Sequence, residues 1–210
     1  MKPARIRILI VDDHPVVVNG LTAMIDPEPD MQIVASAGNG PDAVRLFRDR
    51  LPDVTLMDLN LTPAMTGVEA IQAIRHEYPE ARVIVLSAYK GEEDIFHALK
   101  AGAATYLLKD SLGEELLSTI REVHAGGGPI PAEVGRKLAD RLNQTPLTAR
   151  EIEILKLMAE GKRNKEVAGR LGVTSDTVQQ HIKNIYSKLQ VHDRTEAVTV
   201  AIRRGILHIT

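Results

Sequence analysis

Apolar residues in the first 125 positions fall into five short runs separated by amphipathic stretches. The runs cover residues 6–12, 31–37, 54–58, 82–88 and 104–109. Continuous runs of this length are typical of strands buried on both faces, and the helical periodicity between and after them predicts five helices. The alternation predicts an α/β fold: a flavodoxin-like, doubly wound sheet of five parallel strands in the order 2-1-3-4-5.

The stretch GGGPIP at residues 126–131 breaks this pattern and precedes an all-helical tail. We therefore predict a first domain over residues 1–126, a linker over 127–145 with a short helix in 132–142, and a small all-α domain of four helices over 146–210. A short helix, a turn at Gly172 and a longer helix give the outline of a helix-turn-helix.

Capping residues support several of the expected helix starts. Asn39 with Asp42 and the box of Ser111 with Glu114 open helices of the first domain. In the tail, the expected N-caps are Thr148 with Glu151, Asn164, Thr174, and Asp193 with Glu196.

Charge separates the two halves of the chain. Residues 1–125 carry 12 Lys and Arg against 19 Asp and Glu, a net charge of −7, whereas residues 126–210 carry 14 against 9, a net charge of +5. A basic second domain indicates a polyanionic partner, although solvated faces can also produce such an imbalance. The chain has no cysteine and no apolar run of about 18 residues, so we expect no disulfide, no thiolate metal site and no membrane span, which fits a cytoplasmic protein.

Polar residues follow the predicted strands at one edge of the sheet. Asp12 and Asp13 end the first strand, Asp58 the third, and Ser87 and Lys109 the fourth and fifth. A strand-terminal Asp taken alone is usually a cap or a turn former. Together, these residues offer a carboxylate that can accept a phosphoryl group, oxygen ligands for Mg²⁺, and a lysine and a hydroxyl that can contact phosphoryl oxygens.

The pieces ILIVDDH, LMDL, VIVLSAY and AGAATYLLKD resemble the receiver domain of bacterial two-component response regulators. The resemblance implies that a histidine kinase phosphorylates Asp58. It implies that Asp13, Asp58 and the backbone carbonyl of Asn60 hold Mg²⁺, with Asp12 assisting. It also implies that Lys109 pairs with the phosphate, and that Ser87 and Tyr106 form a switch in which the hydroxyl moves to the phosphoryl group and the ring turns inward.

The loop after Asp58 departs from that family's usual pattern. Pro63 and Gly67 stand five and nine residues after Asp58, whereas the family usually has these residues at four and eight. One extra loop residue is therefore expected. The resemblance also implies that the side chains of Asn60 and of Tyr89, two residues past Ser87, govern the access of water to the acyl phosphate. His14 is expected to be a cap or turn residue rather than a ligand.

The helix predicted from Thr174 is amphipathic, with an apolar side at Val178, Ile182, Ile185 and Leu189. Its polar side is usually just solvated, but in a basic helix-turn-helix it can read bases, and we predict this for Gln179, Gln180, Lys183 and Asn184. Backbone contacts to DNA are predicted for Lys165, Thr177 and Lys188.

The stretch from Leu147 to Val198 resembles the LuxR-type helix-turn-helix of the NarL/FixJ subfamily, over about residues 146–207. The resemblance implies a four-helix domain whose third helix enters the major groove and whose last helix forms a dimer. Family members commonly have Lys-Val where this chain has Gln179-Gln180, so the target sequence cannot be transferred.

These features together predict a DNA-binding, phosphorylation-activated response regulator that is not an enzyme. The expected partners are a sensor histidine kinase, double-stranded promoter DNA, a second copy of the chain and RNA polymerase. One alternative is a regulator that uses the receiver fold only for dimerisation or partner binding, independently of phosphorylation. A second is a phosphatase or phosphotransferase with Asp58 as its nucleophile, against which the DNA-binding tail argues.

Overall fold

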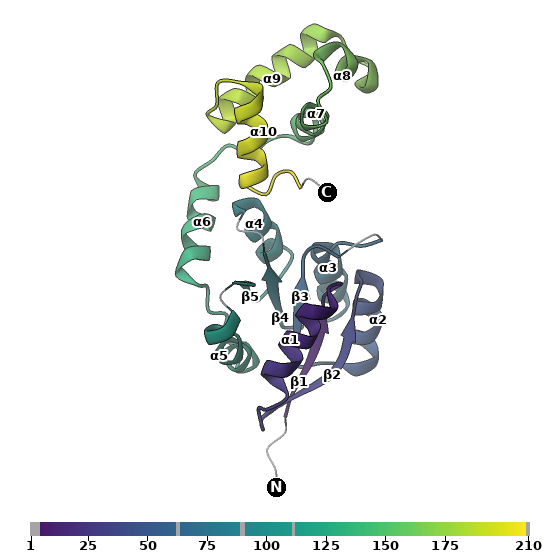
Figure 1. Cartoon of the computed structure of the whole chain (residues 1–210), viewed down its shortest axis with the longest axis vertical. Helices are drawn as coiled ribbons and strands as arrows, with labels where there is room; N and C mark the ends of the chain where they lie inside the picture. The colour runs from purple at the N-terminus through teal and green to yellow at the C-terminus, as the bar shows by residue number, and fades with distance from the viewer. Residues whose placement is uncertain (1–4, 62–63, 89–90, 111, 209–210) are drawn as a thin grey trace. The chain divides into compact units, whose positions relative to one another are not determined.

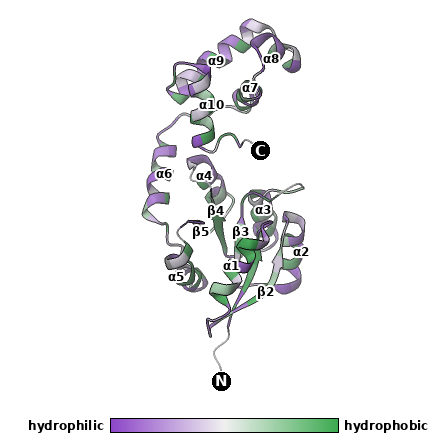
Figure 2. Cartoon of the chain, in the orientation of Figure 1, coloured by the Kyte–Doolittle hydropathy of each residue, from purple (hydrophilic) through white to green (hydrophobic). Residues whose placement is uncertain are grey.

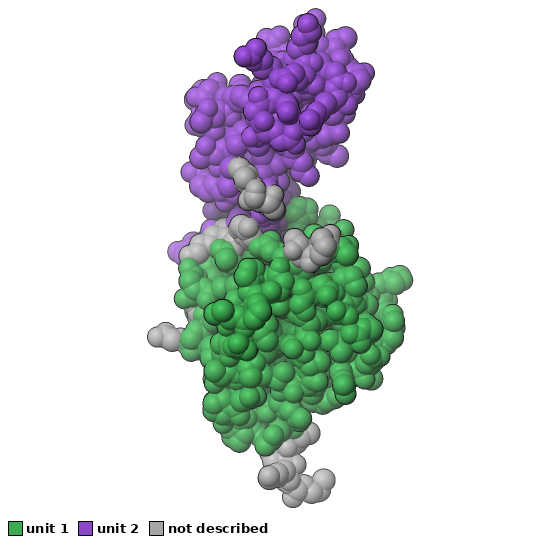
Figure 3. Space-filling model, turned by 45° about the vertical axis from the view of Figure 1, so that its right-hand side comes forward, with its two compact units in different colours: residues 1–89, 95–135 green, residues 90–94, 136–210 purple. Residues whose placement is uncertain are grey.

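The computed structural model describes residues 5–61, 64–88, 91–110 and 112–208 (Figure 1). The chain divides into two compact units, shown in different colours in Figure 3: residues 1–89 with 95–135, and residues 90–94 with 136–210. Within the described residues, no helix is both long enough and apolar enough to cross a membrane.

The first unit is built on a sheet of five parallel strands in the order β2-β1-β3-β4-β5, as predicted. The strands are β1 (Ile6–Val11), β2 (Met31–Ala37), β3 (Val54–Asp58), β4 (Val83–Ser87) and β5 (Thr105–Leu108). Every residue of β3, β4 and β5 is buried, which explains their unbroken apolar pattern. In the strand register, Asp58 lies opposite Leu86, and Ser87 lies opposite Leu108. The polar ends of these strands therefore reach the same edge.

Two helical layers cover the sheet, because successive strand residues point to opposite faces. The helices are α1 (Pro15–Ile25), α2 (Gly40–Arg50), α3 (Gly67–Glu77), α4 (Glu92–Lys100) and α5 (Leu112–His124). Leu9 and Val11 belong to the core that contains residues of α2, α3 and α4, whereas Ile8 and Ile10 belong to the core with α1 and α5. Figure 2 shows the strands as the most hydrophobic part of this unit. The doubly wound fold is confirmed.

The predicted linker helix is present as α6 (Ala132–Leu142). Val134 in its first turn is 1% exposed and belongs to the same core cluster as Leu9 and Tyr106. Just before it, the hydroxyl of Thr105 donates to the carbonyl of Pro129. The first compact unit accordingly extends to Gly135, while the domain limits at residues 126 and 146 stay predictions.

The tail folds into α7 (Ala149–Ala159), α8 (Asn164–Leu171), α9 (Ser175–Leu189) and α10 (Arg194–Arg203), which enclose their own apolar core. Gly172 adopts the left-handed conformation, with φ of 65°, and makes the turn between α8 and α9. The apolar side predicted for α9 is confirmed: Val178, Ile182, Ile185 and Leu189 are all buried.

The predicted caps are partly correct. Asn39 accepts the N–H of Asp42, and the capping box of Thr148 with Glu151 is present. The Ser111–Glu114 box lies outside the described residues. Asn164 is not an N-cap but the first helical residue of α8, and Glu166 accepts the N–H of Arg163 before it.

Asp193 caps α10 by accepting the N–H of Glu196, as expected. The reciprocal half of that box is wrong, because the Glu196 carboxylate accepts the N–H of His192 rather than that of Asp193. Both errors concern single hydrogen bonds whose partners depend on how the chain enters the helix.

Candidate functional site

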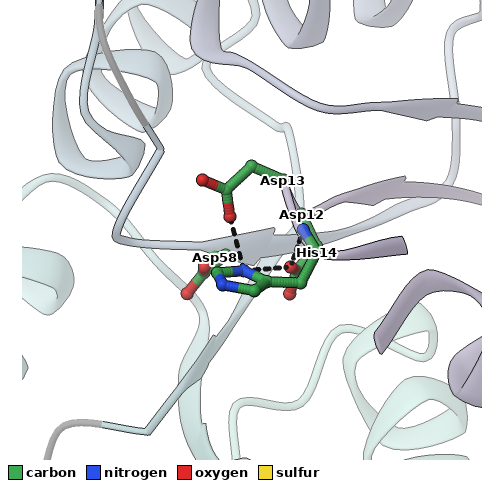
Figure 4. Close-up of side chains that lie close together, drawn as sticks. All are labelled: Asp12, Asp13, His14 and Asp58. Atoms are coloured by element: carbon green, nitrogen blue, oxygen red, sulfur yellow. Dashed lines mark hydrogen bonds and ion pairs between the residues drawn. The ribbon is translucent and has the colours of Figure 1, made fainter. Parts of the chain in front are cut away.

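The carboxylates predicted at the sheet edge lie together (Figure 4). Asp12 follows β1, and Asp58 is the last residue of β3; the two are 4% and 2% exposed. Asp13 and His14 come from the start of the β1–α1 connection. One ligand atom from each of these four residues lies within 4.8 Å of the other three. The parallel topology produces this cluster, because the carboxyl ends of β1 and β3 are neighbours in the sheet.

Lys109, which follows β5, joins the cluster from the opposite side of β3. Its Nζ atom lies 2.6 Å from Oδ2 of Asp12 and 3.2 Å from Oδ2 of Asp58. Burial lowers the pKa of Lys109, but the two carboxylates outweigh burial, so the pKa is raised above its ordinary value. The lysine is therefore held as a cation beside the predicted phosphoacceptor.

Asp58 itself lies in a site that does not favour its ionised form. Burial is the largest effect and raises the pKa of Asp58, and the negative charge of Asp12 raises it further. Lys109 and a backbone hydrogen bond from Asn60 lower the pKa. The net shift is upward. One carboxylate oxygen, Oδ1, is buried and has no hydrogen-bond partner among the described residues. A buried carboxylate oxygen without a partner is costly, so the site is suited to a cationic ligand.

The donor set fits a hard divalent cation such as Mg²⁺, which prefers carboxylate and carbonyl oxygens. Asp12, Asp13 and Asp58 supply the carboxylates, and the unpartnered Oδ1 of Asp58 is the observation that favours a bound ion. Asn60 is partly exposed and follows β3 by two positions. Its carbonyl as a ligand stays a prediction.

The two predicted switch residues are buried in neighbouring strands. Ser87 ends β4 and is fully buried, and its carbonyl accepts the N–H of Lys109 at 2.9 Å. Tyr106 in β5 is also fully buried, with its ring in the core shared with α2, α3 and α4. The ring thus lies inward in this structure. Tyr89, predicted to control access to the site, lies outside the described residues.

The loop after Asp58 ends in a close backbone contact. Gly67 begins α3 and donates its N–H to the carbonyl of Leu59 at 3.0 Å. A Cβ atom on Gly67 would lie 2.1 Å from the carbonyl oxygen of Asp58. Only glycine fits there with the backbone of β3 in its present place, while the extra loop residue stays a prediction.

The predicted DNA-contacting residues lie on α8 and α9 of the second unit. Most of them are exposed: Lys165 on α8, and Thr177, Gln179, Gln180, Lys183 and Asn184 on α9. Some of these side chains bond to each other or to a neighbour on the helix. The side-chain amide of Gln180 donates to Asn184 at 3.2 Å, and the Thr177 hydroxyl lies 2.9 Å from that of Thr174.

Lys188 differs from the other predicted DNA contacts. Its side chain is 23% exposed, and Nζ lies 2.7 Å from Oε2 of Glu151, a carboxylate that is 3% exposed. That oxygen also accepts the N–H of Thr148 at 2.7 Å. Lys188 therefore joins the end of α9 to the start of α7. Sequence reasoning missed this pairing, because 37 positions separate the two residues.

Arg194 is a second internal tie that the sequence did not reveal. Its guanidinium donates to the carbonyls of Met158 and Lys162, at 2.8 and 2.7 Å, at the end of α7. The Met158 carbonyl lies in the last turn of α7, where a helix leaves acceptors without an intrahelical partner, and Lys162 follows the helix by three residues. Arg194 thereby holds α10 against α7.

Comparison with known proteins agrees with this arrangement. Residues 8–121 match the family model of the response regulator receiver domain, and residues 145–201 match that of the bacterial regulatory proteins of the luxR family. The chain is 40% identical to the transcriptional regulatory protein LiaR of Bacillus subtilis, over 97% of this chain and 100% of that one. It is 35% identical to the response regulator VraR of Staphylococcus saprophyticus, over 96% and 99% of the two chains.

Solved structures show the same two-part fold. The response regulator ChrA of a heme-sensing two-component system matches with a TM-score of 0.59 and 33% identity, over 97% of this chain and 100% of that one. An RcsB–DNA complex matches with a TM-score of 0.69 at 22% identity, covering 95% and 98%, which shows a shared fold. With both family models matched in order along one chain, this protein belongs to the LuxR-type, DNA-binding response regulators of two-component systems.

Proposed function

We propose that Asp58 accepts a phosphoryl group from a sensor histidine kinase, and that this modification controls dimerisation and promoter binding. The observation that carries the proposal is the environment of Asp58: a buried carboxylate with one unpartnered oxygen, 3.2 Å from the cationic Lys109. The unpartnered oxygen is available as a nucleophile or as a ligand for a cation, and Lys109 supplies positive charge for an incoming anionic group.

In the transfer, a carboxylate oxygen of Asp58 attacks phosphorus, the phosphorus–nitrogen bond to the kinase histidine breaks, and the imidazole keeps the electron pair. Asp12, Asp13, Asp58 and the carbonyl of Asn60 would hold Mg²⁺, which supplies charge neutralisation between two anions. Lys109 already lies beside Asp58 and donates to a phosphoryl oxygen, while Asp12 retains its own contact with the lysine.

The response then passes through β4 and β5. Ser87 ends β4 at the same sheet edge as Asp58, so its hydroxyl can donate to the phosphoryl group once that group is present. Tyr106 lies one strand further out, opposite Val85. We propose that the phosphorylated state fixes the inward position of the Tyr106 ring and thereby biases the receiver toward one of two conformations.

In the second unit, α9 enters the major groove, and α10 contributes to the dimer. Gln179, Gln180, Lys183 and Asn184 face the bases, and Lys165 and Thr177 contact the backbone. Two copies then meet half-sites about one DNA turn apart. RNA polymerase is a further partner in this proposal. The protein turns over no substrate beyond its own phosphotransfer and dephosphorylation, so we do not propose an enzyme.

The test compares the wild type with Asp58→Ala, and with Asp49→Ala on the exposed part of α2 as control. Each protein is incubated with a phosphorylated histidine kinase or a small acyl phosphate and Mg²⁺, then followed by intact mass, by oligomeric state and by genome-wide DNA binding. We expect wild type and Asp49→Ala to gain one phosphoryl group, to dimerise and to bind promoters. Asp58→Ala should do none of these. Normal regulation by Asp58→Ala would instead support the phosphorylation-independent alternative.

A further inference from the structure

His14 is turned into the carboxylate cluster rather than toward the helix that it precedes. It stands at the N-cap position of α1, as a cap or turn residue would, but its side chain makes no capping hydrogen bond within the described part of the chain. Instead, Nδ1 lies 2.6 Å from Oδ1 of Asp13 and 3.4 Å from Oδ1 of Asp12 (Figure 4). The imidazole thus lies between two carboxylates that fit a divalent cation.

These separations suit donors that share one ion. Two ligands bound at about 2.0–2.1 Å and at right angles to each other are about 3 Å apart. The distances from Nδ1 to the two carboxylate oxygens, 2.6 and 3.4 Å, lie on either side of that value. Small side-chain rotations would therefore allow the nitrogen to occupy one coordination position beside the carboxylates.

Asp58 supplies independent support for a ligand at this point. Its side chain is 2% exposed, and its Oδ1 has no hydrogen-bond partner among the described residues. The His14 side chain is 66% exposed and approaches the cluster from the solvent side. The buried Oδ1 of Asp58 and the solvent-facing Nδ1 of His14 together give the cluster both oxygen and nitrogen donors. The carboxylates alone provide only oxygen.

We propose that His14 is a nitrogen ligand of this cation site and shifts its preference from Mg²⁺ toward transition-metal ions such as Co²⁺. The inference rests on the cation site of the proposed function and adds a residue to it. Mg²⁺ favours oxygen ligands, whereas imidazole favours the later first-row divalent ions, so one nitrogen changes the order of affinities. His14 thereby determines metal specificity, while the three Asp residues determine that a cation binds.

The test measures Mg²⁺ and Co²⁺ affinities of the full chain by calorimetry, together with the electron spin echo of the Mn²⁺-loaded protein. The variants are His14→Gln, His76→Gln as a control on the exposed end of α3, and Asp58→Asn to identify binding at this site. We expect the ratio of Co²⁺ to Mg²⁺ affinity to fall at least about tenfold in His14→Gln and to be unchanged in His76→Gln. Nitrogen modulation of the Mn²⁺ echo should disappear only in His14→Gln and Asp58→Asn.

Two results would overturn the inference: equal changes in both affinities, or Mn²⁺ modulation that does not depend on His14. In either case, Mg²⁺ binding that depends on Asp58 would leave the proposed function intact. A wild-type protein that binds none of these ions at the Asp58 site would remove both the inference and the cation in the proposed function. Far-ultraviolet circular dichroism confirms that each variant is folded before the metals are added.

Discussion

Lys188 and Glu151 form an ion pair that joins the last turn of α9 to the first turn of α7, with Nζ 2.7 Å from Oε2. Glu151 is 3% exposed and also accepts the backbone N–H of Thr148. The orientation of α9 within its domain therefore depends on a buried carboxylate and on the lysine that compensates it.

Lys188→Met should destabilise the second domain by about 2 kcal/mol at neutral pH, because Glu151 keeps its burial and loses its partner. Lys183→Met on the exposed side of α9 is the matched control, with a change within about 0.5 kcal/mol. Urea denaturation followed by circular dichroism, with hydrogen exchange of α7 and α9, measures both. Equal stability of the two variants would show that the pair contributes nothing.

The same pair predicts a pH dependence. Burial raises the pKa of Glu151, but Lys188 and the Thr148 hydrogen bonds outweigh it, so the pKa lies below its ordinary value of 4.5. A lowered carboxyl pKa contributes stability above that ordinary value, and the contribution is lost as the pH falls through the folded-state pKa. The free energy of unfolding of Lys188→Met should therefore fall less on acidification than that of the wild type. Parallel pH profiles would contradict this.

Asp58→Asn should stabilise the unphosphorylated receiver at pH 7 by about 1–2 kcal/mol, measured without divalent ions. Burial is the main cause of the raised pKa of Asp58, so the folded state favours the protonated carboxyl. The stability that the protonated carboxyl gives the folded state is lost as the pH rises through the folded-state pKa, and an asparagine, which stays neutral, avoids this loss. Lys109 would keep its contact with Asp12.

The gain in Asp58→Asn should shrink as the pH approaches 3.8, the ordinary pKa of Asp, because the wild-type carboxyl is then neutral as well. Asp49→Asn on exposed α2 should show neither effect. Thermal unfolding at several pH values distinguishes the outcomes, and a destabilised Asp58→Asn protein at pH 7 would refute the electrostatic account of this site.

Gly67→Ala should destabilise the receiver and abolish phosphorylation of Asp58, because the new Cβ would lie 2.1 Å from the Asp58 carbonyl oxygen. Gly20→Ala is the matched control: Gly20 is an exposed residue inside α1, and a Cβ added there would have no neighbouring atom within 4 Å. That change should stabilise the protein by about 0.5–1 kcal/mol. Thermal unfolding and intact mass after phosphorylation give both readouts, and tolerance of Gly67→Ala would disprove the close approach.

Lys165→Met and Gln179→Ala should affect DNA binding differently. Loss of a phosphate-contacting lysine weakens binding to all sequences and reduces the slope of log affinity against log salt by about 1. Loss of a base-reading glutamine should cost about 1–3 kcal/mol on the cognate site and relax the preference at one base pair. Binding titrations on cognate and scrambled DNA at several salt concentrations measure both. Identical behaviour of the two variants would exclude the proposed division of roles.

The sequence by itself determined the sheet, its strand order and the residues at its functional edge. Buried parallel strands leave unbroken apolar runs, and right-handed connections leave little freedom in how such runs are ordered. Asp12, Asp58 and Lys109 stand at the carboxyl ends of β1, β3 and β5, so the parallel topology placed them at one edge of the sheet. The buried side of α9 followed equally from helical periodicity.

Only the tertiary structure decided where individual side chains point and which distant groups they meet. Lys188 resembles any other basic surface residue in the sequence, and only the structure shows Glu151 beside it. His14 stands at the N-cap position of α1, as expected, and only the structure shows its ring beside carboxylates. Gly67 looks displaced in the sequence, yet its backbone lies against Asp58. The periodicity of apolar residues predicts the face of a helix or strand on which a residue lies. Ion pairs and close contacts between distant residues depend on how the helices and strands pack, which no local stretch of sequence specifies.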